Sequence, residues 1–261
     1  MKHTMEDLIE IMSILRGKDG CPWDKAQDHE TLRPYVIEEA YEVIDAIDRG
    51  ESGDLVEELG DLLLQVIFHS RIAEERGDFD FSDVIDGICK KMIRRHPHIF
   101  GEKHVKDQAE VLKNWEKIKQ EEKEITTLAD SMEGLPKTLP ALMEAFKVQE
   151  KAARVGFDWD DVKYPMAKVI DELEELKEVY KGENRDKIKE ELGDLIFSCV
   201  NVARFLGVEP ELCLREATQK FIRRFGSVEA ETTKFGKTLQ DMTLIEMDKL
   251  WNEAKKMEKK L

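Results

Sequence analysis

The sequence predicts an all-α protein made of two tandem helical-bundle domains, and three observations carry that prediction. Charged residues make up 38% of the 261 residues and aromatic residues 7%, with only 15 Gly and 7 Pro, a composition typical of helices. Apolar residues recur at helical spacing along most of the chain. The hexapeptide ELGDLL at 58–63 returns as ELGDLI at 191–196, which indicates an internal duplication.

The first copy is expected to form helices separated by turn-forming residues. Residues 5–16 have the apolar spacing of an amphipathic helix. The segment 17–32 is rich in turn residues and predicts a loop, after which Asp28 or Thr31 caps a second helix. That helix should end near Arg49, and further helices are expected at 54–76, 83–95 and 107–124, with Gly50, Gly53, Gly77 and Pro97 at the breaks.

A connector follows the first copy. Residues 126–142, TTLADSMEGLPKTLPAL, include Gly134, Pro136 and Pro140, and their Leu and Met side chains indicate that the segment packs against a domain. We therefore expect an N-terminal domain at 1–125, a connector at 126–140 and a C-terminal domain at 141–261.

Charge and cysteine usage narrow the class of protein. The formal net charge is −16 and the pI is near 5.0, which argues against a broad nucleic-acid-binding face. Four cysteines without CxxC spacing predict reduced, mostly buried thiols in a cytoplasmic protein. The N-terminus lacks the uncharged apolar stretch of a signal peptide, and no apolar run is long enough to cross a membrane.

Two acidic clusters are the chemical signal. Glu38-Glu39-x-x-Glu42 and Glu57-Glu58-x-x-Asp61 place acids one turn apart on a helix face. Such a face alone is usually only solvated. The offset 191 − 58 = 133, however, carries both clusters into the second copy, where the acids are Asp171, Glu172, Glu175, Glu190, Glu191 and Asp194.

Conserved spacing between otherwise divergent copies favours a metal site over a solvated face. Carboxylates about 4 Å apart repel by ~1 kcal/mol in water and ~4 kcal/mol at a partly buried site, so a cluster of them favours a divalent cation. Oxygen ligands without paired His or Cys indicate Mg²⁺ or Mn²⁺.

The pattern EExxE-x15-ExxD, present twice and preceded by CPWD at 21–24, resembles the MazG family of nucleoside triphosphate pyrophosphohydrolases over nearly the whole chain. The resemblance implies an all-α NTP pyrophosphatase fold, a homodimer, and Mg²⁺-dependent cleavage of an NTP to NMP and pyrophosphate. It implies metal ligands at Glu39, Glu42, Glu58 and Asp61, and at Glu172, Glu175, Glu191 and Asp194. Asp171 and Glu190, like Glu38 and Glu57, are candidates for orienting the attacking water or supporting the ligands.

The two copies differ in their cations. Lys168 and Lys187 each lie one helical turn before a ligand of the second copy, where they suit triphosphate oxygens, whereas the first copy has Tyr35 and Asp54. The alternative is that both lysines only form ion pairs with the acids. We predict that the second copy carries most of the activity.

Further candidate substrate contacts come from two other motifs that are repeated in the second copy. KKMIRR at 90–95 resembles QKFIRR at 219–224, and NWEKIK at 114–119 resembles LWNEAK at 250–255. In the second copy these supply a cationic strip, a tryptophan that either stacks on a base or packs in a core, and a lysine for phosphate: Lys220, Arg223, Arg224, Trp251 and Lys255.

Three functions fit this sequence. The leading one is an NTP pyrophosphohydrolase of broad or housecleaning specificity. The others are a dUTPase-like hydrolase of a single nucleotide, and a regulatory dimer that binds Mg²⁺-nucleotide without turnover.

Overall fold

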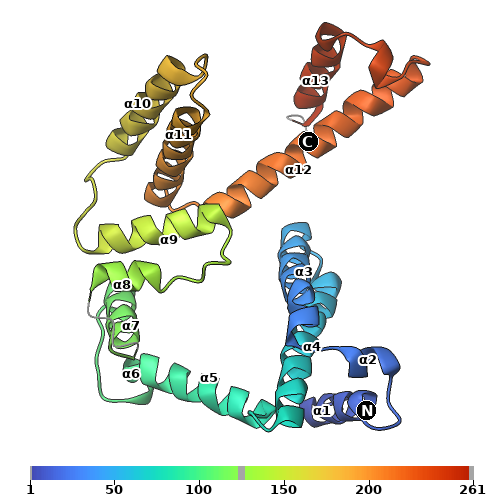
Figure 1. Ribbon diagram of the computed structural model, residues 1–261, viewed down its shortest axis with the longest axis vertical. Coiled ribbons are helices and arrows are strands. Elements are labelled where there is room, and N and C mark those ends of the chain that lie inside the picture. The colour runs from blue at the N-terminus through green and yellow to red at the C-terminus, as the bar shows by residue number, and fades with distance from the viewer. Residues whose placement is uncertain (1, 123–126, 259–261) are drawn as a thin grey trace. The chain divides into compact units, whose positions relative to one another are not determined.

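The computed structural model describes residues 2–122 and 127–258, which fold into helices without any strand (Figure 1). The chain divides into two units, Met1–Lys119 and Gln120–Leu261. Within the described ranges, no helix is long and apolar enough to cross a membrane. The all-α fold predicted from the sequence is confirmed.

The first unit is organised around a helical hairpin. Asp28 caps one arm by accepting hydrogen bonds from the N–H groups of Glu30 and Thr31, both at 2.9 Å. Gly50 and Gly77 end the two arms with left-handed φ angles of 72° and 78°. The helices are α1 (Met5–Arg16), α2 (Pro22–Ala26), α3 (His29–Arg49), α4 (Ser52–Arg76), α5 (Phe81–Arg95), α6 (Pro97–Phe100) and α7 (Gln108–Glu122), with α3 and α4 forming the hairpin.

The expected loop at 17–32 is therefore partly helical. Pro22 starts α2, since proline suits the first helical position. Arg16 holds α2 and α4 to the end of α1: its guanidinium pairs with Glu75 at 2.8 Å and donates to the carbonyl oxygens of Asp24 and Gln27. The core beneath is Met12, Leu32, Ile67, Phe68 and Ile72.

The second unit repeats the hairpin. Its helices are α8 (Leu128–Glu133), α9 (Ala141–Arg154), α10 (Lys163–Val179), α11 (Arg185–Phe205), α12 (Pro210–Lys234), the 3₁₀ helix η1 (Leu239–Asp241) and α13 (Leu244–Glu258). α10 pairs with α11, α9 packs on α11, and α12 pairs with α13 (Figure 1). The segment expected to be a connector contains α8, which packs on α9 with Ser131 and Lys151 2.5 Å apart. The connector therefore belongs to the second unit.

The duplication also appears in side-chain contacts outside the hairpins. The guanidinium of Arg95 lies over the ring of Trp115 at 5.2 Å, and that of Arg224 lies over Trp251 at 5.8 Å. Both pairs join the two echoed motifs, so these motifs are structural counterparts.

The expectation that the cysteines are mostly buried is wrong. Cys21 is half-buried, and Cys89, Cys199 and Cys213 are exposed. The last three lie on faces of α5, α11 and α12 that turn away from the interior. All four are free thiols.

A histidine pair joins α3 to α4 in the first unit and gives a prediction for pH. The Nδ1 atoms of His29 and His69 lie 2.8 Å apart, and their rings are stacked. Burial, together with His29, holds the pKa of His69 below its ordinary value. The folded unit thus binds fewer protons than the unfolded chain below about pH 6.5, so its stability falls as pH drops through that window.

The His69→Gln variant keeps a polar partner for His29 but does not titrate. We expect the wild-type melting temperature to fall more than that of the variant between about pH 7.5 and pH 5.5. Parallel pH profiles of the two proteins in circular dichroism melts would contradict this role for His69.

Candidate metal and nucleotide site

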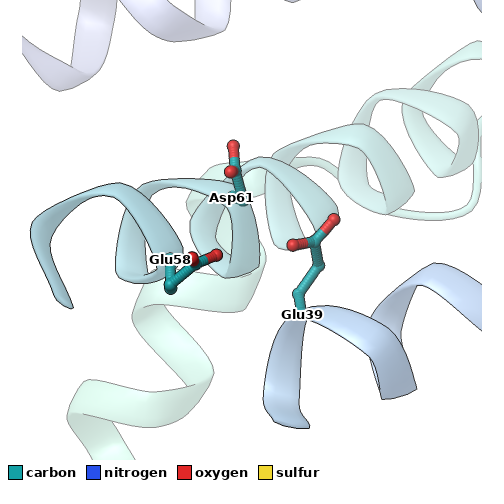
Figure 2. A group of neighbouring side chains, drawn as sticks. All are labelled: Glu39, Glu58 and Asp61. Atoms are coloured by element: carbon teal, nitrogen blue, oxygen red, sulfur yellow. The ribbon is translucent and has the colours of Figure 1, made fainter. Parts of the chain in front are cut away.

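The first carboxylate cluster lies between the arms of the α3–α4 hairpin. Glu39 extends from α3 toward α4, which carries Glu58 and Asp61 one turn apart (Figure 2). One carboxylate oxygen of each residue lies within 4.8 Å of the others. The helical spacing ExxD and the pairing of the two helices therefore bring together three of the four predicted ligands. The fourth, Glu42, lies near enough to Glu39 to raise its pKa.

Burial and the neighbouring carboxylates raise the pKa values of two acids of this cluster, Glu39 and Glu58. Burial raises the pKa of Glu39, and the carboxylates of Asp61 and Glu42 add to the effect. Burial likewise raises the pKa of Glu58, with further contributions from Glu42, Glu57 and Asp61. The first cluster thus has an excess of negative charge that a divalent cation would relieve.

One cation does lie nearby, and the sequence comparison missed it. Arg49, at the end of α3, pairs with Asp54 at 2.9 Å, and its charge lowers the pKa of Glu58. Asp54 occupies the position of Lys187 in the other copy, so the first copy places an ion pair where the second has a lysine.

The second cluster lies at the corresponding place in the α10–α11 hairpin. Oxygens of Glu172, Glu175 and Glu191 lie within 4.8 Å of one another. Glu172 is 6% exposed and Glu191 only 3%. Asp194, the fourth predicted ligand, is exposed on the next turn of α11 and lines an adjoining pocket.

Lysines neutralise the second cluster. The Nζ of Lys168 lies 2.5 Å from Glu172 and 3.9 Å from Glu175, and that of Lys187 lies 2.6 Å from Glu191. The bond to Glu172 raises the pKa of Lys168, and the bond to Glu191 raises that of Lys187. The i,i+4 pairing weighed as the alternative role is therefore present, and it involves two of the carboxylates that would bind a metal, Glu172 and Glu191.

Both lysines are also accessible to a ligand. Their side chains are 44% and 46% exposed, although their nearest partners, Glu172 and Glu191, are almost fully buried. A lysine stem with four rotatable bonds can move its ammonium group from a carboxylate to a phosphate oxygen without moving the helix.

A pocket of about 330 Å³ opens beside this cluster. Lys168, Glu172 and Asp194 form one side of it. The remaining lining comes from α9, from the loop between α9 and α10, from Pro165 of α10 and from the second half of α11, and it includes the aromatic rings of Phe157 and Trp159. The pocket therefore combines charged side chains of both signs with a largely apolar lining.

The other predicted site residues lie apart from the pocket lining. Asp171 and Glu190 are exposed, and Glu190 pairs with Lys187 at 3.3 Å. Arg224 binds Glu258 at 2.7 Å, and Trp251 packs on Phe221 with ring centroids 5.0 Å apart. Lys220, Arg223, Arg224, Trp251 and Lys255 all lie on α12 and α13, outside the described lining of the pocket.

Comparison with known proteins places the chain in a family. Residues 27–100 and 161–228 match the MazG nucleotide pyrophosphohydrolase domain. The chain is 46% identical over 250 residues to the nucleoside triphosphate pyrophosphohydrolase/pyrophosphatase MazG of Thermotoga maritima, covering 96% of this chain and 95% of that one. It is 42% identical over 261 residues to the Escherichia coli nucleoside triphosphate pyrophosphohydrolase, covering 98% of each. The chain belongs to the MazG nucleotide pyrophosphohydrolase family.

Membership of the MazG family makes the protein a hydrolase, as its sequence predicts. The chain is also 48% identical over 259 residues to the uncharacterized protein YabN of Bacillus subtilis, and spans 53% of that longer protein. Both matched segments of the family domain contain one carboxylate hairpin, so the duplication inferred from the sequence is a duplication of the MazG domain.

Sequence reasoning missed three uncharged polar residues of the pocket, Gln149, Ser198 and Asn201, and also the ion pair of Asp158 with Arg204. A signal for two of them was present in the MazG repeat itself. The same offset of 133 that aligns the ExxD motifs places Ser198 opposite Gln65 and Asn201 opposite Phe68. At this position the first copy has a phenylalanine of the core, and the second copy has an asparagine that lines the pocket.

Proposed function

We propose that the protein is a Mg²⁺-dependent nucleoside triphosphate pyrophosphohydrolase that converts NTP or dNTP to the monophosphate and pyrophosphate. The observation that carries the proposal is the second hairpin, where three clustered carboxylates, two lysines and a pocket adjoin one another. Such a site holds a polyanion and its metal together.

The residues present fit a hard divalent cation. Each cluster offers oxygen ligands from three carboxylates within 4.8 Å, the donor set that suits Mg²⁺ or Mn²⁺. Glu172, Glu175, Glu191 and Asp194 would hold the ion in the second copy, and Glu39, Glu42, Glu58 and Asp61 in the first. When bound, Mg²⁺ supplies polarisation of a phosphate oxygen and a water of lowered pKa.

The side chains of the second copy divide the remaining work. Lys168 and Lys187, once released from Glu172 and Glu191, donate to triphosphate oxygens and offset the charge that spreads over them in the transition state. Glu190 and Asp171 are exposed beside the cluster, where a carboxylate can accept a proton from the attacking water. Lys220, Arg223, Arg224, Trp251 and Lys255 form a second cationic and aromatic surface for the substrate on α12 and α13.

The reaction is tested by its products. The purified chain is incubated with Mg²⁺ and a panel of ribonucleoside and deoxyribonucleoside triphosphates, and pyrophosphate and orthophosphate are measured separately. We expect pyrophosphate and the monophosphate in equal amounts from several bases. Release limited to dUTP would favour the dUTPase-like alternative. Orthophosphate as first product would contradict the proposal, and tight binding without turnover would favour a regulatory dimer.

We further propose that two copies of the chain associate. The hairpin arms carry large apolar side chains that the described part of their own unit leaves exposed, including Ile170 at 60%, Leu192 at 45% and Ile196 at 47%. Apolar residues repeated along a helix pair are typical of an interface between subunits.

The four free thiols agree with a reducing, cytoplasmic location.

The assembly gives a prediction for Ile170→Glu. A carboxylate in an apolar interface is costly to desolvate, so we expect this variant to shift the mass in light scattering from two chains toward one. Lys181→Glu, an exposed change past the end of α10, is the control and should keep the wild-type mass. A monomeric wild-type protein would contradict the proposal.

A further inference from the structure

The pocket of the second unit contains polar groups that neither a metal nor a phosphate requires. Gln149 on α9 and Ser198 on α11 are each 8% exposed, and Asn201 on α11 is half-buried. All three line the pocket. They are uncharged, so their chemistry suits a neutral ligand with donors and acceptors rather than an anion.

Their existing bonds fix what each of them offers. Gln149 donates from Nε2 to the carbonyl oxygen of Phe197 at 2.8 Å, and its buried Oε1 has no partner among the described residues. Since a buried polar group normally has a partner, this oxygen indicates a ligand that supplies one. The Ser198 side chain lines the same pocket and offers a hydroxyl.

Asn201 completes the set with a donor. Its Oδ1 accepts from Nε of Arg204 at 2.9 Å, which leaves the Nδ2 group to donate. Arg204 is itself held by Asp158, with nitrogen–oxygen distances of 2.6 and 3.0 Å. The guanidinium is thus committed to the protein and orients the asparagine.

These groups continue the line of the carboxylates along one helix. Glu191, Asp194, Ser198 and Asn201 follow at intervals of three, four and three residues, so they share one face of α11. The face changes from charged to neutral over about 15 Å, ten residues at 1.5 Å each. A nucleotide has the same order, from an anionic triphosphate to a neutral base.

The aromatic part of the pocket suits a flat ligand. Phe157 and Trp159 lie in the loop between α9 and α10 and line the same cavity. Trp159 is 44% exposed, so part of its indole is free to stack on an entering ring.

The first unit has different side chains at the positions that correspond to Asn201 and Ser198. Phe68 occupies the position of Asn201 and is 3% exposed in the core with Met12 and Leu32. Gln65, at the position of Ser198, donates to Glu39 at 3.4 Å. The first copy therefore has a core phenylalanine at this place, and the second copy has an asparagine that lines a pocket.

We propose that this pocket is the nucleobase subsite of the second copy. Asn201 donates from Nδ2 to an acceptor on the base, and Ser198, with the Gln149 Oε1 beside it, accepts a base N–H. Trp159 stacks on the ring. The inference rests on the proposed function and adds that the base is read along its hydrogen-bonding edge, in this copy alone.

Equilibrium binding tests the subsite independently of turnover. The full chain is titrated with Mg²⁺ and the α,β-methylene analogues of ATP, GTP, CTP and UTP, and separately with inorganic tripolyphosphate, which lacks a base. Asn201→Phe introduces the residue of the first copy, and Ser198→Ala removes only the hydroxyl. Thr232→Val, a buried hydroxyl lost from α12 outside the pocket lining, is the control.

We expect the wild type and Thr232→Val to bind at least one analogue about tenfold or more tightly than tripolyphosphate, because a site that hydrogen-bonds its ligand discriminates strongly. Asn201→Phe should bring the affinity for the analogue down to that for tripolyphosphate without weakening the binding of tripolyphosphate itself. Ser198→Ala should reduce the ratio of the two affinities several-fold. If Asn201→Phe fails to fold in circular dichroism, Ser198→Ala decides.

An unchanged ratio in both variants, or equal weakening of both ligands, would overturn the base subsite. Pyrophosphate release from the natural triphosphates is measured in parallel. Pyrophosphate release in a protein that binds no analogue more tightly than tripolyphosphate contradicts the subsite alone. Tighter binding of an analogue without pyrophosphate release contradicts the proposed function alone.

Discussion

Glu175→Gln and Glu191→Gln are each expected to reduce pyrophosphate release by about 10²–10³-fold, a typical effect of removing one group that stabilises a charged transition state. Both residues belong to the second cluster, and glutamine keeps the size of the side chain while removing its charge. The loss should appear in kcat at saturating nucleotide, because the missing carboxylate serves the reacting phosphate more than the base.

The matched control lies on the same helix. Glu174 is exposed, pairs with Lys177 at 2.8 Å and lies outside the cluster, so Glu174→Gln should keep nearly all turnover. The corresponding first-copy changes, Glu42→Gln and Glu58→Gln, should each cost less than about tenfold if the second copy carries most of the activity. Loss of turnover in Glu42→Gln with retention in Glu175→Gln would show that the ranking of the copies is wrong.

Lys168→Met is expected to strengthen the binding of a metal ion and to weaken the binding of the nucleotide. In the free protein the Lys168 ammonium lies on Glu172 and within 4 Å of Glu175, where a divalent ion would bind. Without it, Mn²⁺ should bind the second cluster about tenfold more tightly in the absence of nucleotide, because the carboxylates lose an internal competitor. The KM for the triphosphate should rise by a similar factor or more, because a phosphate contact is lost.

Mn²⁺ titration followed by electron paramagnetic resonance separates the two copies. A Glu58→Gln background weakens the first cluster, so the remaining binding reports on the second. Lys177→Met, which removes an exposed lysine paired with Glu174 on the same helix, is the control and should change neither quantity. Weaker Mn²⁺ binding in Lys168→Met would contradict competition between the lysine and the metal.

The sequence predicted the parts of this structure that depend on helical periodicity. The hairpin arms, their glycine stops and the meeting of Glu39 with Glu58 follow from spacing and from the pairing of adjacent helices. The lysine positions followed from the same spacing. Their partners in the free protein did not, because a lysine one turn from a ligand can bind either that carboxylate or a phosphate.

Tertiary packing decided what the sequence did not show. Arg49 reaches Asp54 across the turn between α3 and α4, which helix-by-helix comparison of the copies does not reveal. The pocket depends on three elements converging, and its polar residues are ordinary helix residues when viewed singly. Trp251 also packs on its own hairpin, on Phe221, and no spacing rule distinguishes such a contact from a ligand contact.

The exchange of Phe68 for Asn201 has a consequence for the heat stability of the two halves. A half that keeps an open pocket gives up dispersion contacts that its counterpart makes, so it should melt first. Ligands stabilise only the state that binds them, so nucleotide with Mg²⁺ should raise the lower calorimetric transition and leave the upper one in place. We therefore expect duplication to have separated two demands: a closely packed core in the first half, and an open ligand pocket in the second.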